Sequence, residues 1–113
     1  MVRGANPPEG AGKYYEMLRQ RPQPGVVFER FADAWLADEG LEAMGAFLEG
    51  KAAAADAVAG DHFLLAMHRV RQGEDLKALE AFAKGLAVDA ANARGWLEKA
   101  RLEVRLLEFE AAL

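Results

Sequence analysis

Hydrophobic residues recur at intervals of three and four positions along most of the chain, and this spacing predicts amphipathic α-helices. Prolines, glycines and short acidic clusters interrupt the pattern, as is typical of turns between helices. The expected helices cover residues 13–21, 25–37, 41–54, 61–71, 75–88 and 94–111. No segment shows the strict alternation of a half-buried strand, so the pattern predicts an all-α chain.

The same spacing predicts which side of each helix faces a core. The expected inward residues of the first five helices are Tyr14, Met17, Leu18, Val27, Phe28, Phe31, Ala34, Trp35, Leu41, Met44, Phe47, Leu48, Phe63, Ala66, Met67, Val70, Leu76, Leu79, Phe82 and Leu86. Asp61, directly after a glycine, is a candidate N-cap for the fourth helix.

The last expected helix is apolar on two sides. Its main stripe consists of Trp96, Leu97, Ala100, Val104 and Leu107. Leu102, Leu106 and Phe109 form a second apolar face, which we interpret as a capping site, a homodimer contact or a seam to another segment.

Glycines and aromatic residues recur at a fixed distance along the chain. Gly25, Gly60 and Gly95 follow one another at intervals of 35 positions, and Phe63 and Phe82 lie 35 positions after Phe28 and Phe47. The packing of a closed helical bundle does not require such a fixed spacing. Stacked hairpins do, because each hairpin offers the next one the same projections and gaps.

The repeated segments resemble the tetratricopeptide repeat, a helix–turn–helix unit of about 34 residues. The pattern of the family's first helix is matched by Phe28, Phe31, Ala32 and Trp35. Its second-helix pattern of small, aromatic and small residues is matched twice, by Ala43, Phe47 and Gly50 and by Ala78, Phe82 and Gly85.

The resemblance covers about residues 13–111 and has two departures. Ala55 and Ala90 stand where the family usually has a proline that ends the second helix. In the second copy of the first helix, Ala66 and Met67 exchange the small and large positions. The resemblance implies antiparallel hairpins stacked as a short right-handed α-solenoid.

Domain organisation follows from composition and from the helical pattern. Residues 1–12 are rich in proline and glycine and hold almost nothing apolar, which predicts a mobile tail. Residues 13–113 are expected to form a single helical domain.

The family is known for binding a peptide or helix of a partner protein in a concave groove lined by first helices. Projected onto this chain, the resemblance implies a partner-binding groove at Glu29, Asp33, Leu36, Leu64, His68, Arg71, Arg101 and Arg105, with Val26, Asp61 and Glu98 beside them.

Charge and composition narrow the range of partners. The net charge of −4 does not favour nucleic-acid binding, and no run approaches the roughly 18 apolar residues of a membrane span. Cysteine is absent, which excludes disulfides and cysteine-based zinc sites and fits a cytoplasmic protein.

Candidate chemistry is sparse. The segment EGAGKYY (9–15) resembles a phosphate loop only superficially, because Pro7 and Tyr14 occupy positions that require glycine and Ser/Thr. His62 and His68 lie six residues apart and point to opposite sides of a helix, so they cannot share a metal ion. Serine is absent, and no carboxylate pair is marked for acid–base work. We therefore expect no enzymatic activity, no cofactor and no metal.

Three hypotheses of function follow. The preferred one is a non-enzymatic adaptor or scaffold that binds a protein or peptide partner. The second is a homodimer formed through Leu102, Leu106 and Phe109. The third is an accessory segment of a larger enzyme or transport complex, suggested by FEAAL (109–113), where the resemblance places the start of another helix.

Overall fold

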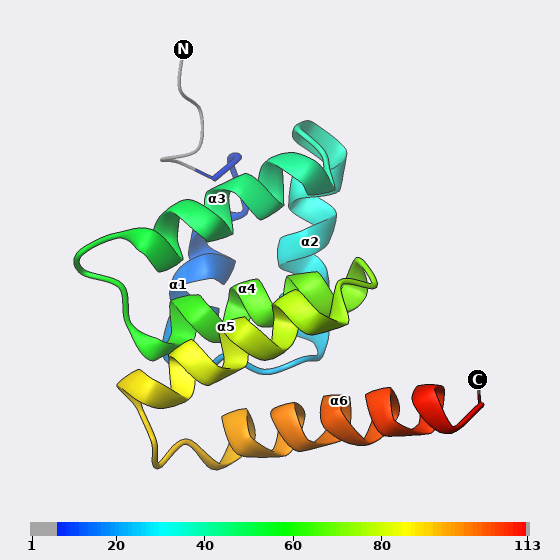
Figure 1. Ribbon diagram of the computed structural model, residues 1–113. Coiled ribbons are helices and arrows are strands. Elements are labelled where there is room, and N and C mark those ends of the chain that lie inside the picture. Colours follow the sequence, from blue (N-terminus) through cyan, green and yellow to red (C-terminus); the bar gives the residue numbers. More distant parts are fainter. Residues whose placement is uncertain (1–6, 113) are drawn as a thin grey trace.

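A computed structural model of the chain describes residues 7–112 and contains, within that range, six α-helices and no β-strand (Figure 1). The helices are α1 (Gly12–Gln20), α2 (Val26–Asp38), α3 (Leu41–Ala53), α4 (Ala59–Arg71), α5 (Asp75–Val88) and α6 (Ala93–Ala112). The all-α class is confirmed, and each helix begins and ends within two residues of its predicted bounds. No helix in the described range is long and apolar enough to span a bilayer.

The turn between α2 and α3 shows why the predicted boundaries hold. Gly40 has a φ of 96°, a left-handed conformation that glycine adopts without steric cost. Its N–H donates to the carbonyl of Trp35 at 2.7 Å, which closes the last turn of α2. The polypeptide then enters α3 at Leu41.

The start of α4 differs from the prediction. The helix begins at Ala59, so Asp61 stands at its third position rather than at the N-cap. Asp61 Oδ2 accepts the backbone N–H of Val58 at 2.9 Å, which satisfies one of the free donors of the first turn. The carboxylate therefore still caps the start of the helix, but from its third residue and not from the N-cap.

The core is a cluster of aromatic rings that continues into the α4–α5 hairpin. Tyr15, Phe31, Trp35 and Phe47 of the first three helices contact one another with ring centroids 5.1–6.5 Å apart. α4 packs against α5 along its length and also contacts α1 and α3, while α6 lies against α5 (Figure 1). α4 is thus the central helix of the molecule.

The regular stack implied by the sequence resemblance is not confirmed. In a stack of equivalent hairpins, corresponding helices of successive hairpins lie side by side. Here the backbone of α1 lies beside that of α4, whereas the backbones of α2 and α4, and those of α4 and α6, come close at few points or none. The three glycines spaced by 35 residues also differ in role: Gly25 precedes α2 with open space around it, Gly60 contacts the α1 backbone, and Gly95 contacts Phe63.

The N-terminal segment also differs from the expected tail. Residues 1–6 lie outside the described residues. Pro8 and Ala11 are buried, and the N–H of Ala11 donates to the carbonyl of Pro8 at 2.9 Å. A packed turn therefore leads directly into α1, because these two small apolar residues find a place on the core that composition did not reveal.

The predicted inward face of α6 is reversed. Leu102 is buried and Leu106 packs against the core, whereas Leu97, Val104 and Leu107 are exposed. The cause is Gly95, whose missing side chain lets this side of α6 approach the ring of Phe63. Leu102 therefore cannot take part in the expected homodimer contact, because it belongs to the core of its own chain.

Two smaller corrections concern single residues of α1 and α5. Tyr15, which the spacing did not predict to face inward, is buried in the core, whereas Met17 is exposed. Leu76, expected to face inward, lies in the first turn of α5 and is also exposed.

Candidate partner-binding cleft

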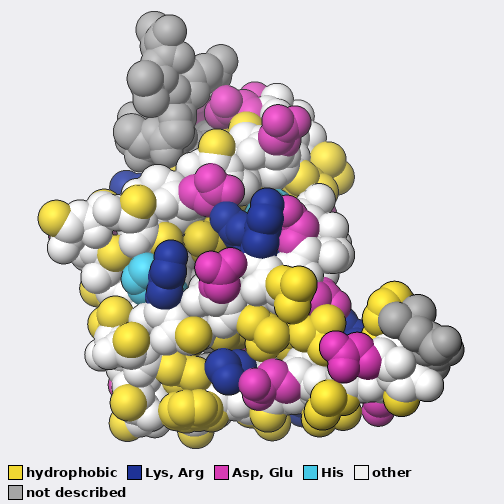
Figure 2. All heavy atoms as spheres, viewed as in Figure 1, with side chains coloured by type: hydrophobic (Ala, Val, Ile, Leu, Met, Phe, Trp, Pro, Cys, Tyr) yellow, Lys and Arg dark blue, Asp and Glu magenta, His cyan; other side chains and the backbone are white. Residues whose placement is uncertain are grey.

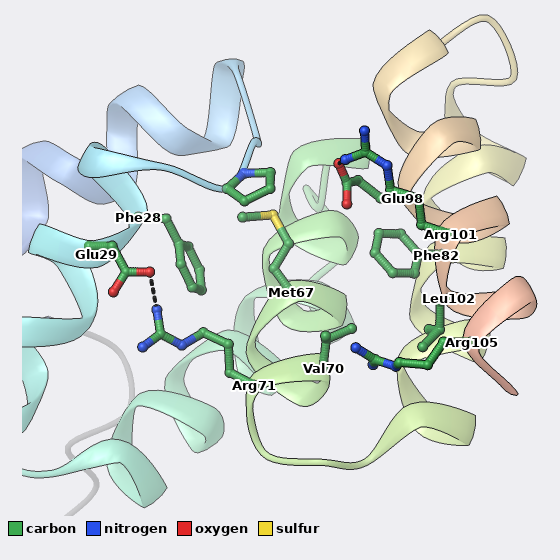
Figure 3. Close-up of a pocket in the computed structure, with 11 residues that line it drawn as sticks. Phe28, Glu29, Met67, Val70, Arg71, Phe82, Glu98, Arg101, Leu102 and Arg105 are labelled. Atoms are coloured by element: carbon green, nitrogen blue, oxygen red, sulfur yellow. Dashed lines mark hydrogen bonds and ion pairs between the residues drawn. The ribbon is translucent and has the colours of Figure 1, made fainter. Parts of the chain in front are cut away.

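A cleft of about 350 Å³ opens between α2, α4 and α6, and the aromatic ring of Phe82 from α5 lies at its base (Figure 3). These three helices carry the residues that the sequence resemblance projects onto a groove, because each is taken as the first helix of a repeat. The residues that line the cleft are Pro24, Phe28, Glu29, Met67, Val70, Arg71, Phe82, Glu98, Arg101, Leu102 and Arg105.

The floor of the cleft is apolar. Phe28 of α2, Met67 of α4, Phe82 of α5 and Leu102 of α6 are buried, and Val70 of α4 is half-buried between them (Figure 3). Met67, Val70 and Arg71 share one face of α4, because residues three and four positions apart on a helix are neighbours. A single strip of α4 therefore supplies the middle of the floor and part of the rim.

The α2 side of the rim is an ion pair. The guanidinium of Arg71 donates to the carboxylate of Glu29, and it lies 5.6 Å from the centre of the Phe28 ring (Figure 3). This hydrogen bond, assisted by the positive charge, lowers the pKa of Glu29 from its ordinary value. The pair closes one end of the apolar floor.

The α6 side of the rim carries two more arginines. Arg101 Nη1 lies 3.4 Å from Glu98 Oε2, and Arg105 Nη2 lies 2.8 Å from Asp75 Oδ1 at the start of α5. The arginine side chains of the three rim pairs are 44–63% exposed, and such exposed ion pairs are weak in water. The arginines can therefore exchange their present partners for carboxylates of a bound protein at little cost.

Four of the eight residues projected from the resemblance line this cleft: Glu29, Arg71, Arg101 and Arg105. Asp33 and Leu36 are exposed on α2 but lie outside it, and Asp33 faces a shallow hollow beside Lys13 and Tyr14. The structure thus brings together four charged residues of the expected groove from three separate helices.

Leu64 and His68 do not belong to an accessible groove. Leu64 is 0% exposed, and His68 is 6% exposed. A Cβ added at Gly45 would lie 2.9 Å from His68 Nε2, so the imidazole packs directly on α3. The projection failed at these two positions because α4 is covered by α1, α3 and α5, which leaves only its Met67–Arg71 strip facing the cleft.

Sequence reasoning missed the apolar floor. Phe28, Met67 and Phe82 were expected in the core, and Leu102 was assigned to a dimer contact. Each is indeed mostly buried, yet each also borders the cleft. The spacing of Met67, Val70 and Arg71 places all three on one face of the fourth helix, and this face could have been predicted to border a groove.

A second polar cluster surrounds Asp61, which is 1% exposed. Its Oδ1 accepts the hydroxyl of Tyr15 at 2.6 Å, and its Oδ2 accepts Arg19 Nε at 3.1 Å and the Val58 N–H at 2.9 Å. Burial and the hydrogen bond to Asp61 raise the pKa of Tyr15. These contacts fix α1 to the start of α4, so we interpret the cluster as a structural tie.

Within residues 7–112, no three side chains of His, Asp or Glu gather closely enough to hold a metal ion. Burial lowers the pKa of both His62 and His68, so the two imidazoles are neutral near pH 7.

Comparison of the chain with models of protein families, with curated proteins and with solved structures found no match in any of the three.

Proposed function

We propose that this chain is a non-enzymatic protein-interaction module of the tetratricopeptide-like kind, which binds an amphipathic segment of a partner protein in the cleft between α2, α4 and α6. The observation that carries this proposal is an apolar floor bordered by three arginines, Arg71, Arg101 and Arg105. Recognition sites for helical segments combine a hydrophobic groove with a polar rim.

The charges of the rim favour an acidic partner. Glu29 and Glu98 line the cleft with the three arginines, whereas Asp75, the partner of Arg105, lies outside its lining. An acidic partner that displaces these weak pairs would meet three positive charges, although the whole chain carries a charge of −4. Complementary charges orient a partner and speed its association more than they add affinity. The part of the floor that is still accessible, chiefly Val70, adds to the affinity, since burial of apolar surface drives association. The expected ligand therefore carries two or three large apolar residues on one helical face, flanked by Asp or Glu.

Selection of peptides from a random display library tests this function. The enriched sequences should carry apolar residues three and four positions apart together with acidic residues. Val70→Glu, which places a charge on the floor, should abolish their binding, and Arg71→Glu should weaken it about tenfold or more.

The matched control is Arg30→Glu, an identical charge reversal on an exposed residue of α2 outside the cleft, which should bind like the wild type. Circular dichroism checks that each variant keeps its helicity. Selected peptides that bind the Val70→Glu variant as well as the wild type, or that show no acidic preference, would refute the proposal.

A further inference from the structure

The outer face of α6 carries an apolar stripe that no other part of the described chain covers. Its six residues follow one another at steps of four, three, four, three and four positions, and all six are exposed: Ala93, Leu97, Ala100, Val104, Leu107 and Ala111. In Figure 2 hydrophobic side chains alternate with charged ones along the lower edge of the molecule, which α6 forms.

The stripe lies on the side of α6 that turns away from the protein. The inward side of the helix consists of Gly95, Leu102 and Leu106, which are buried or half-buried. The two sets alternate along the helix, so α6 has apolar residues on two opposite faces. One face has a known partner in α5, and the other has the spacing of a two-stranded coiled-coil seam.

We propose that this outer face of α6 binds the same face of a second copy of the chain, and that the two helices run antiparallel. Steps of three and four residues keep a seam on one side of a helix and allow side chains to interlock with those of a facing helix. The stripe spans nearly the whole of α6, about 27 Å.

The sizes of the stripe residues favour the antiparallel direction. With the two-fold axis at Leu102, Leu97 faces Leu107 of the second copy, and Ala100 faces Val104 of the second copy. A small residue then meets a larger one near the middle of the seam. In a parallel pair each residue meets its own copy, so Ala100 meets Ala100 and leaves a void.

The charges beside the stripe favour the same direction. In the antiparallel register Arg94 lies opposite Glu108 of the second copy, and symmetry produces this attractive pair twice. In a parallel pair Glu103 would lie beside Glu108 of the second copy, again twice, and like charges there are unfavourable.

Two like-charge pairs remain at the two-fold axis of the antiparallel dimer. Arg101 meets Arg101 on one side of the seam, and Glu103 meets Glu103 on the other. Each of these residues has an opposite charge on its own helix, because Arg101 Nη1 lies 3.4 Å from Glu98 Oε2 and Lys99 Nζ lies 3.0 Å from Glu103 Oε2. The intrahelical partners reduce the repulsion.

Dimer formation leaves the cleft open. Arg105 and Leu102 face the cleft from the other side of α6, and Arg101 alone borders both surfaces. The two surfaces share only Arg101, so Leu107→Glu on the stripe and Val70→Glu on the cleft floor distinguish a failure of the dimer from a failure of the proposed function.

Sedimentation equilibrium of the full chain tests the dimer. The mass should rise from 12.3 kDa towards twice that value as the concentration increases. Leu107→Glu should hold the protein at the monomer mass, and since Leu107 is 66% exposed, its helicity should stay that of the wild type. Leu76→Glu, at an equally exposed leucine of α5 away from the stripe, is the matched control and should dimerise normally.

A charge swap tests the register. Arg94→Glu alone and Glu108→Arg alone should each raise the dimer dissociation constant about tenfold, because each converts two attractive pairs into repulsive ones. The double variant should recover most of the wild-type affinity, because it lacks only the intrahelical pair of Arg94 with Glu98, 3.3 Å apart in the wild type.

Engineered thiols test the direction, because the chain contains no cysteine. In the antiparallel dimer a mixture of Leu97→Cys and Leu107→Cys proteins should form a mixed disulfide on oxidation. Leu97→Cys alone should not cross-link, since its two copies lie about 15 Å apart. A wild type that stays monomeric throughout, a dimer that survives Leu107→Glu, or a Leu97→Cys homodisulfide would each overturn the proposal.

Discussion

Gly60 occupies the point at which α4 crosses the end of α1. A Cβ built on it would lie 1.8 Å from the carbonyl oxygen of Arg19, an atom of the backbone that cannot rotate away. The two helices can therefore approach this closely only because residue 60 has no side chain. The same contact places Asp61, the next residue, within reach of Tyr15 and Arg19.

We expect Gly60→Ala to destabilise the protein by about 2 kcal/mol or more, although alanine is the better helix former, because α1 must shift. Gly50→Ala is the matched substitution. Gly50 lies in α3 with nothing within 4 Å of an added Cβ, so alanine there should stabilise by about 0.5–1 kcal/mol. Urea unfolding measures both changes, and an equal effect at the two sites would contradict the close approach.

The hydroxyl of Tyr15 is a second feature that stabilises the contact between α1 and the start of α4. Tyr15→Phe leaves one oxygen of a buried carboxylate without this donor, so we expect a loss of about 1–2 kcal/mol in the free energy of unfolding. Tyr14→Phe changes a half-buried tyrosine beside it and should have an effect below about 0.5 kcal/mol. A loss of similar size in both variants would show that the hydrogen bond from Tyr15 to Asp61 does not contribute specifically to stability.

At the scale of the helices, Phe63 of α4 connects α5 and α6. A Cβ built on Gly85 would lie 2.5 Å from the nearest atom of the Phe63 ring, and a Cβ built on Gly95 would lie 2.7 Å from it. One aromatic side chain thus fills the space that two glycines on neighbouring helices leave free. This contact sets how α6 is oriented and which of its faces is left outward.

We expect Gly95→Ala to destabilise the protein by about 1–3 kcal/mol and to speed amide hydrogen exchange in α6, because the added methyl group pushes the helix away from Phe63. Phe63→Leu makes room for that methyl group. In the Phe63→Leu background the cost of Gly95→Ala should therefore fall by about 1 kcal/mol. Strictly additive effects of the two substitutions would show that Phe63 does not position α6.

The helices themselves were predictable because their signals are local. Apolar spacing together with Pro22, Pro24, Gly40 and Gly73 defined six segments to within two residues. The orientation of α6 was not predictable, because the helix is apolar on two sides and the choice depends on a contact with Phe63, 32 residues earlier in the chain. Spacing identifies an apolar face, but it does not say which face a distant residue will cover.

The whole molecule is organised around α4, and this explains how much of the cleft could be foreseen. A projection that treats α2, α4 and α6 as equivalent names four residues that line one cleft, Glu29, Arg71, Arg101 and Arg105. It fails at Leu64 and His68, because α4 is covered on more sides than the other two helices. Equivalence along the sequence therefore identified residues at the rim of the cleft but not the residues of its floor.

The stability of the whole molecule should depend on pH near neutrality. Burial holds the pKa values of His62 and His68 below their ordinary value of 6.5. The unfolded chain therefore binds protons more readily than the folded chain. Their contribution is fully present above about pH 6.5 and is lost as the pH falls through that value towards the folded pKa values.

Urea midpoints at about pH 7.5 and pH 5.5 measure this dependence. We expect a lower midpoint at the lower pH in the wild type. His68→Gln should reduce the difference, because His68 is the more deeply buried of the two, and His62→Gln should reduce it less. A wild-type difference that persists unchanged in both variants would assign the pH dependence to other groups.

The two tryptophans of the chain lie in opposite environments, so their fluorescence can distinguish the core from α6. Trp35 is 1% exposed among the aromatic rings of the core, whereas Trp96 is 49% exposed at the edge of the α6 stripe. Iodide should quench the emission of Trp96 and spare that of Trp35, so the quenchable fraction reports on α6 alone. Dilution of the unmodified protein, followed by quenching, would then separate association from unfolding in one cuvette.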